Sequence, residues 1–450
     1  MKKAIYFYML ALVALWLPAG CDFLEIPAPK DQLVRSNVYT SDQSATAVVS
    51  GIYNGLIDAS GQLGNLGIAA ELCADQLVYA GNDNGLMQFF ENSIDETNGY
   101  IHNLWTAFYR NIYRCNAVLE GLADAGEISP PLQSRLVGEV LAIRAFCYFY
   151  LTNLWGDVPL VTHTDYRTNQ RVGRTPAATV REAILADLLK ADELLSGDYP
   201  SANRARINRS AVQGLLARVY WVSSDWQRAE AAASAVIDDP AYVLEAPAAT
   251  FSLGSRETIW QLLPYNFPAQ APTYIPGRQD IIPTFYLAPD GVGAFPAGDE
   301  RRREWMAANV VGEVEYTYPH KYKVASGNNP VTEGLVVLRL AEPYLIRAEA
   351  RAMLGDDEGA LADLNAVRQR AGLDGLDVQE EALLQAIAAE RRSEFFTEWG
   401  LRWLDLKRSG TIDEVLTAVK PGWQPTDAWW PLPLNERQRN PELVPQNDGY

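Results

Sequence analysis

The stretch SAVQGLLARVYWVSSDWQRAEAAASAVI, residues 210–237, has a later counterpart in PYLIRAEARAMLGDDEGALADLNAVRQR, residues 343–370. Each reads as two helices joined by a short turn. Alanines 12 positions apart occur in both stretches, at Ala217 and Ala229 and at Ala348 and Ala360. Because small residues let two antiparallel helices approach closely, this spacing is typical of a tetratricopeptide helix–turn–helix unit.

Further helices extend this pattern in both directions. Residues 139–155 carry apolar side chains at helical spacing and resemble a first helix of the same kind. Residues 179–195 supply its partner after an insertion, and residues 381–408 supply a fourth pair. Capping boxes mark expected helix starts at Thr179 and Ser210. We predict a mainly α fold, built as a tetratricopeptide-like array of about four helix pairs.

The remaining chain is less regular, and we expect it to form a large loop-rich half with a few short strands. Helical periodicity places the scaffold mainly in residues 41–56, 100–237 and 341–408. Gly, Pro, Asn and aromatic residues are frequent in the expected loops, at residues 57–99, 241–335 and 411–450. Because loops on a rigid scaffold often carry binding residues, the loop-rich half is the expected ligand side.

The N-terminus has the features of an export signal. Lys2 and Lys3 precede an uncharged apolar run of 14 residues that ends at Leu17. This run is too short for a comfortable membrane span but suits a signal-peptide core. Small residues then stand directly before Cys21, as in a bacterial lipobox, with Pro18 where Leu is usual. We expect removal of residues 1–20 and lipidation of Cys21.

The mature chain, residues 21–450, is then expected to be a single domain that is anchored to a membrane and does not thread through it. Residues 21–30 are Pro-rich and read as an extended tether. An ordinary secretory signal, with Cys21 incidental, is the alternative.

The composition excludes some classes of function. The chain has 450 residues and a formal net charge of -18. This acidity disfavours general nucleic-acid binding, because phosphate backbones reward basic surfaces, and it disfavours a polybasic membrane patch. The chain has 12 Trp and 22 Tyr against 13 Phe. Trp and Tyr combine a flat apolar face with a polar group, which suits sugar-like ligands as well as cores.

No motif indicates catalysis. G-x-S-x-G, H-E-x-x-H, GxGxxG and the phosphate-binding P-loop are all missing from the sequence. Glu390 and Glu394 share one helical face, with Arg391 and Arg392 nearby. A general acid/base pair is one interpretation, and an ion-paired helix packing on its neighbour is the favoured one. We expect no enzyme activity, no catalytic residue, no cofactor and no metal site.

The cysteines are also expected to have a structural role and no reactive one. If Cys21 is lipidated, three cysteines remain, which allows at most one disulfide. Cys115 and Cys147 fall in expected helices among large apolar neighbours, which favours buried free thiols.

Several blocks of sequence resemble those of one known family. Cys21–Pro27, CDFLEIP, looks like its start, and residues 154–160, LWGDVPL, are close to its L-x-G-x-V-P-L stretch. ERRSE at residues 390–394, followed by GLRWLDLKR at residues 400–408, is its most recognisable block. The ending from Pro431 to Tyr450 matches its usual close and leads us to expect a natural C-terminus. On these residues the chain resembles the SusD/RagB-like outer-membrane lipoproteins.

This resemblance implies a protein of the cell outer membrane, lipid-anchored and facing the exterior. Such a protein would sit as a lid on a SusC-like, TonB-dependent β-barrel transporter and capture oligosaccharides, or peptides in some branches. The resemblance also implies four tetratricopeptide-like helix pairs and no catalysis. It assigns the block from Glu390 to Arg408 to packing and helix pairing. Ligand residues vary within the family and are not carried over, and Asp448 departs from the family by standing where Pro is common.

Candidate ligand contacts are the aromatic and polar residues of the expected loops. Aromatic faces would stack on sugar rings, and Asn or Asp side chains would bond hydroxyls. The candidates are Tyr79, Asp83, Asn84, Phe89, Phe90, Asn92, Tyr100, Tyr265, Phe267 and Tyr274. Local loop packing is the alternative for each of them.

Three rival functions remain open at this point. Peptide cargo is the closest, because an acidic surface tolerates basic peptides. A helix-pair scaffold that binds a protein partner without a small ligand is the second. Glycoside hydrolysis needs two carboxylates at a set separation, which no pattern in the sequence shows.

Overall fold

The computed structural model describes residues 38–57, 64–265, 267–268, 270–327 and 330–450. The predicted signal peptide, lipidated Cys21 and tether lie outside the described residues. Within them, helices dominate and strands are few and short, which confirms the predicted mainly α fold.

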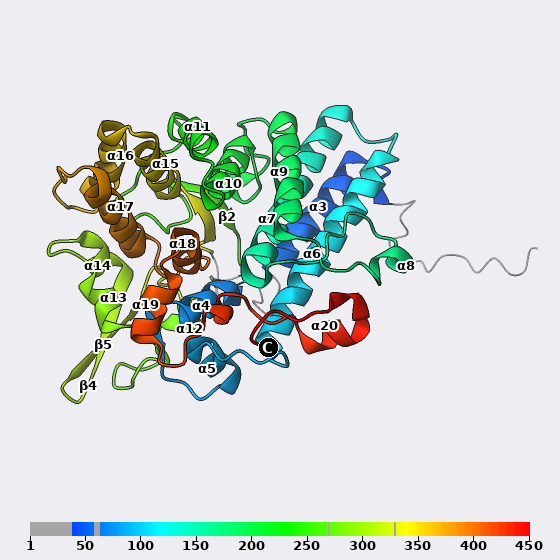
Figure 1. The fold of residues 1–450 in the computed structure, drawn as a ribbon. Coiled ribbons are helices and arrows are strands. Elements are labelled where there is room, and N and C mark those ends of the chain that lie inside the picture. Colours follow the sequence, from blue (N-terminus) through cyan, green and yellow to red (C-terminus); the bar gives the residue numbers. More distant parts are fainter. Residues whose placement is uncertain (1–37, 58–63, 266, 269, 328–329) are drawn as a thin grey trace, which may run out of the picture.

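Three pairs of helices form a continuous row along one side of the molecule (Figure 1). The pairs are α7 (Pro130–Trp155) with α9 (Ala177–Leu194), α10 (Arg209–Val222) with α11 (Trp226–Ile237), and α15 (Ala341–Leu354) with α16 (Asp357–Arg370). Neighbouring pairs also contact each other, through α9 with α10 and α11 with α15. The array predicted from the alanine spacing is therefore present.

Four alanines bring the members of two pairs close together. Ala217 on α10 and Ala229 on α11 are fully buried, as are Ala348 on α15 and Ala360 on α16. Because protein interiors are close-packed, a larger side chain at these positions would push the helix backbones apart. The 12-residue spacing thus marks real helix contacts.

The row continues at both ends. At one end, α17 (Glu380–Glu394) packs against α15 and α16, and α18 (Leu401–Ser409) follows it as the predicted fourth pair. At the other end, α3 (Asp42–Leu56) and α6 (Gly99–Ala123) both pack on α7.

The two predicted helix N-caps, Thr179 and Ser210, are wrong by three and two residues. Helix α10 is capped by Asn208, whose Oδ1 accepts the Ala211 amide N–H at 3.0 Å, whereas Ser210 bonds Asp239. Helix α9 begins at Ala177, two residues before Thr179. The Ala177 N–H donates to Asp157 Oδ1 at 2.8 Å, so the cap comes from a residue 20 positions away that a local capping motif does not include.

The loop-rich half contains short antiparallel strands, as predicted. Among the described residues they form two-stranded sheets: β1 (Leu77–Tyr79) with β3 (Phe285–Leu287), β2 (Thr258–Leu262) with β6 (Leu335–Arg339), and β4 (Met306–Val311) with β5 (Val314–Pro319). The β1–β3 sheet joins two loop segments that are far apart in the sequence.

The segment at residues 57–99, predicted to be loop-rich, also contains helices. This segment holds α4 (Gly64–Cys73) and α5 (Asn84–Glu91). From Leu66 to Cys73, α4 is buried on every side. A helix without a solvent face has no apolar and polar alternation, so the periodicity that reveals other helices is missing.

The remaining elements are short, and several lie in the expected loops. They are α8 (Tyr166–Asn169), α12 (Gln270–Tyr274), α13 (Pro289–Gly293), α14 (Glu300–Trp305), α19 (Ile412–Val419), α20 (Leu434–Arg439) and the 3₁₀ turns η1 (Ala202–Arg204), η2 (Pro425–Ala428) and η3 (Pro441–Leu443). None of the described helices combines the length and the apolar character that crossing a bilayer requires.

The cysteines of the described chain are free and buried, as predicted for Cys115 and Cys147 and also true of Cys73. Burial raises the pKa of the Cys115 thiol to about 12, so it is protonated at neutral pH. These thiols act as small apolar side chains in the core.

Glu390 and Glu394 lie in a buried ion-pair network, which confirms the favoured interpretation of this block. Arg301 of α14 contacts both carboxylates at 2.6 Å, through Nη1. From the neighbouring helix α16, Arg368 pairs with Glu390 and Arg370 pairs with Glu394. The two glutamates therefore hold helices together.

Arg339, the last residue of β6, joins this network from the loop-rich half. Its guanidinium pairs with Glu394, with Glu398 and with Glu257, which immediately precedes β2. Burial by itself would raise the pKa of Glu394, but Arg370, Arg339 and Arg301 hold it well below its ordinary value. Glu394 is thus the negative centre around which three guanidinium groups gather.

We expect Glu394→Ala to destabilise the protein strongly, because it leaves buried guanidinium groups without their shared counter-charge. Breaking a buried pair in this way costs about 3–5 kcal/mol. Urea unfolding followed by circular dichroism measures the change. Glu193→Ala is the matched control, since Glu193 pairs only with exposed Lys190 at the surface and should cost less than about 1 kcal/mol. Equal stability of the two variants would contradict this role of Glu394.

Candidate functional site

Most of the ligand candidates predicted in residues 57–100 gather around α5. Asp83 caps this helix, with its Oδ1 accepting the Leu86 N–H at 2.9 Å. The Tyr79 hydroxyl accepts the Asp83 N–H at 2.8 Å, and the Tyr100 hydroxyl donates to Asp83 Oδ2 at 3.3 Å. The hydrogen bonds of Asp83 thus serve to hold the start of α5.

Four of the candidates are buried: Tyr79, Phe89, Asn92 and Tyr274. Tyr79 and Tyr274 both pack on Phe285 of β3, which brings the two predicted loop segments together. Phe89 packs edge-on against Trp430, and Asn92 ends α5 with its Nδ2 donating to the Cys73 carbonyl. In this structure these side chains have protein neighbours where a ligand would have to lie.

The other candidates are more accessible. Asp83 and Asn84 are exposed at the start of α5, and Tyr100 is half-buried beside them. Phe90 and Phe267 are also half-buried, with the Lys420 ammonium 4.0 Å from the centre of the Phe90 ring. Tyr265 is 89% exposed in the Pro-rich loop. Ligand contact by any candidate stays a prediction.

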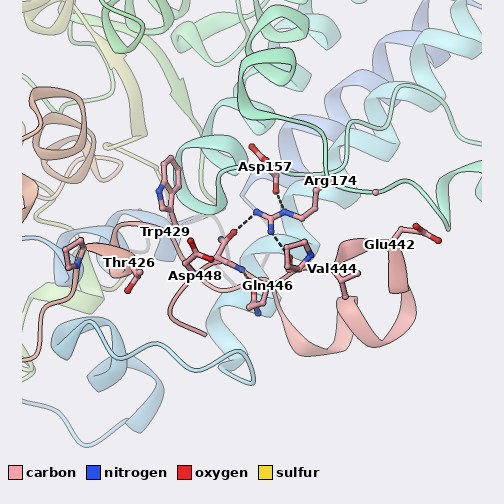
Figure 2. A pocket seen from close by; sticks show the side chains of 12 residues that line it. Asp157, Arg174, Thr426, Trp429, Glu442, Val444, Gln446 and Asp448 are labelled. Carbon is pink, nitrogen blue, oxygen red and sulfur yellow. Dashed lines mark hydrogen bonds between the residues drawn. The ribbon is translucent and has the colours of Figure 1, made fainter.

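A polar cleft of about 730 Å³ opens beside the C-terminal segment (Figure 2). We call it the C-terminal cleft. It is lined by Asp157, Gly173, Arg174, Pro425, Thr426, Trp429, Glu442, Val444, Pro445, Gln446, Asn447 and Asp448. A cleft of this volume, with one aromatic wall and several polar groups, has the character of a small-molecule site.

Arg174 fastens the C-terminal segment to the body of the protein. Its Nε donates to the Asp157 carbonyl at 3.0 Å and its Nη1 to the Pro445 carbonyl at 2.7 Å, while Nη2 bonds Asn447 Oδ1. Asn447 Nδ2 in turn donates to the carbonyls of Trp155 and Trp430. These bonds fix the floor of the cleft, as Figure 2 shows for Arg174.

Trp429 forms the aromatic wall and is 39% exposed. The Lys407 Nζ lies 3.3 Å from the centre of its ring and donates to the carbonyls of Asn153 and Ala428. Gly156 lies beside the ring, because a Cβ built there would be 3.4 Å from Trp429 Cε3. The indole is therefore supported on one side while part of it faces the cleft.

The amine of Lys407 is buried and bonds two backbone carbonyls that carry no net charge. Burial lowers the pKa of Lys407 well below its ordinary value. The two carbonyl oxygens that it bonds are neutral, so they satisfy its N–H groups without supplying a counter-charge. Lys407 belongs to the block that the sequence assigned to packing, and in the structure it positions Trp429.

Most residues of the C-terminal cleft come from a segment predicted to be loop-rich, but none of them was predicted as a ligand contact. Residues 411–450 were expected on the ligand side, yet Trp429 was not among the candidates. The adjacent pair Trp429 and Trp430 was the available signal, although only the fold shows that Trp430 is buried and Trp429 is not. Nothing local marks Arg174, since its partners Pro445 and Asn447 lie more than 270 positions away.

Comparison with protein families gives two matches that together cover most of the chain. Residues 22–221 match a family described as starch-binding and associating with the outer membrane. Residues 298–450 match the SusD family. The SusD-like protein P25 of Formosa agariphila is 26% identical over 95% of this chain and 96% of its own length.

Solved structures share the whole fold. A SusD superfamily protein from Bacteroides vulgatus superposes with a TM-score of 0.81 at 18% identity, covering 92% of this chain and all of its own. A laminarin-binding SusD-like protein superposes with a TM-score of 0.77 at 24% identity, with 92% of this chain and 100% of that one covered. At these low sequence identities, the structural likeness shows a shared fold.

We expect Lys407→Met to lower the free energy of unfolding by about 1–3 kcal/mol near pH 10, because the carbonyls of Asn153 and Ala428 lose their donor. At neutral pH the loss is smaller, because the variant also removes the cost of burying a lysine whose pKa is lowered on folding. The loss should grow as the pH rises towards 10. Because burial lowers the pKa of the folded amine, the unfolded chain binds more protons at this group as the pH rises towards 10. The stability of wild type relative to the variant therefore increases with pH until the unfolded lysine titrates. Urea unfolding at several pH values measures this.

Lys190→Met is the control for this variant, because Lys190 is an exposed lysine that pairs with Glu193 on the surface of α9. It should change stability little and without this pH trend. A Lys407→Met variant whose stability differs from wild type by the same amount at pH 7 and pH 10 would contradict a lowered pKa for the Lys407 amine.

Proposed function

Because the chain belongs to the SusD family, we propose that it is a surface lipoprotein that captures oligosaccharides and passes them to a TonB-dependent transporter of the outer membrane. The family description, starch-binding and associating with the outer membrane, supports a glycan as ligand and the outer membrane as location. The laminarin-binding relative supports the same class of ligand.

The C-terminal cleft is the proposed binding site for the glycan. Trp429 offers a flat apolar surface on which the C–H face of a sugar ring stacks. Around it, the carboxylates of Asp157 and Asp448 supply acceptors for hydroxyl groups. Stacking and hydrogen bonding bind and orient a glycan without making or breaking a bond, so the proposed role is capture and not hydrolysis.

The same weak interactions, stacking and hydrogen bonding, would also allow the glycan to be released to the transporter. Sugar stacking and exposed hydrogen bonds are individually weak, so the ligand leaves readily once the binding face turns towards a second site. A lipid on Cys21 would keep the protein next to a β-barrel partner while allowing it to open and close as a lid. The tether at residues 21–30 would allow that movement.

Alanine substitution of Trp429 tests the site. We expect Trp429→Ala to weaken glycan binding about tenfold or more, measured by calorimetry against a panel of purified polysaccharides that includes laminarin and starch. Tyr265→Ala is the comparison, since Tyr265 is an exposed aromatic candidate in the Pro-rich loop.

The two variants separate the competing sites. Loss of binding in Tyr265→Ala alone would move the site to the Pro-rich loop, and full binding in both variants would remove the cleft from the proposal. If wild-type protein binds no polysaccharide but binds peptides, the ligand class proposed here is wrong. Release of reducing sugar by the purified protein would contradict a role without catalysis.

The proposed partnership has a separate test. We expect a large β-barrel protein to copurify when the chain is extracted from its native outer membrane in mild detergent. Cys21→Ser should abolish this association, because the protein then lacks its lipid anchor. Recovery of the wild-type chain without any β-barrel protein, under conditions that preserve other membrane complexes, would count against the partnership.

A further inference from the structure

The C-terminal cleft is lined by more negative than positive charge. Asp157, Glu442 and Asp448 contribute carboxylates, and Arg174 contributes the guanidinium. Glu442 and Asp448 are both exposed residues of the C-terminal segment. Figure 2 shows that they lie on the C-terminal segment, whereas Asp157 lies across the cleft from it, beside Arg174.

The guanidinium group of Arg174 already bonds other parts of the fold. Three of its N–H groups bond the Asp157 carbonyl, the Pro445 carbonyl and Asn447 Oδ1. Burial lowers the pKa of Arg174, while Asp157 and Asp448 act in the opposite direction. An incoming anion would therefore meet a guanidinium already directed at backbone and amide oxygens, with two carboxylates close to it.

We propose that the C-terminal cleft is selective for uncharged oligosaccharides and excludes glycans that carry carboxylate or sulfate groups. This inference rests on the proposed function and narrows its ligand class. An acidic sugar stacked on Trp429 would place its charge near Asp157 and Asp448, with Glu442 at the far end of the cleft, in the field of a chain with net charge -18. A neutral sugar uses the same carboxylates as hydrogen-bond acceptors for its hydroxyls.

The repulsion has a defined size and salt dependence. At a separation of about 7 Å in water-like surroundings, each rim carboxylate changes the affinity for a singly charged sugar by roughly threefold. Two of them then account for a factor of about 5–10. Because both are exposed, salt at about 0.5 M should screen most of this effect. Neutral ligands should show no such dependence on salt.

Matched pairs of polymers test the selectivity. Neutral laminarin, starch and hydroxyethyl cellulose are each compared with a sulfated or carboxymethylated derivative of the same backbone, by calorimetry on the full chain at low and high salt. We expect at least one neutral polymer to bind, and its charged derivative to bind at least fivefold more weakly at low salt. The derivative should recover affinity as salt increases.

A charge-removing variant assigns the effect to the cleft. In Glu442→Gln/Asp448→Asn, we expect the ratio of the affinity for the charged derivative to the affinity for its neutral parent to rise about fivefold to tenfold at low salt. Glu313→Gln/Glu315→Gln removes the same charge from the exposed β4–β5 hairpin, which lies far from α20 in Figure 1, and should leave both affinities unchanged.

The outcomes separate this inference from the proposed function. Binding of no polymer in either form overturns the proposed function itself. Binding of the charged derivatives as tightly as their neutral parents, or more tightly, overturns the selectivity while leaving glycan capture intact. An equal response of the charged derivative to the two double variants would trace the discrimination to net charge and overturn the role of the cleft.

Discussion

The contact between Glu394 and its three guanidinium partners holds the two halves of this protein together. Arg370 comes from the helix array, Arg301 from the short helix α14, and Arg339 from the end of β6. A fully buried carboxylate cannot remain ionised without such partners, and buried guanidinium groups cannot remain without the carboxylate. The loops of β2 and β6 are thereby locked onto α17 in one arrangement.

The C-terminal cleft also depends on contacts between residues that are far apart in the sequence. The C-terminal segment has little regular structure, and it is held by Trp430, which is buried against Trp155 at 5.3 Å between ring centres. The Trp155 indole N–H donates to the Pro431 carbonyl at 2.9 Å. Because Trp430 is fixed in the core, its neighbour Trp429 must turn outward over Lys407 and face the cleft.

These two features explain how a helix-pair scaffold can present a specific surface. The helices supply a rigid row, the buried ion pairs attach the loops to that row, and the tail closes over α7. Rigid attachment matters for weak ligands, since a site that is already ordered does not spend binding energy on ordering loops. The proposed selectivity then comes from charges that need no further movement.

Much of the fold could be read from local pattern. The alanine spacing identified the contacts of α10 with α11 and of α15 with α16, and the buried thiols of Cys115 and Cys147 followed from their apolar neighbours. The prediction failed where the signal is not local. Helix α4 has no polar face to reveal its period, and α9 takes its cap from Asp157 in a distant loop.

For the site, the sequence determined which kinds of residue were available and which segments would carry them, because turn-forming and aromatic residues can be counted without a structure. Only the tertiary structure decided which of them face a ligand. Phe89 and Tyr79 look as suitable as Trp429 in the sequence, yet both are buried while Trp429 lines a cleft. The physical reason is that exposure depends on contacts between residues hundreds of positions apart, such as Trp155 with Trp430, and such contacts form only when the chain is folded.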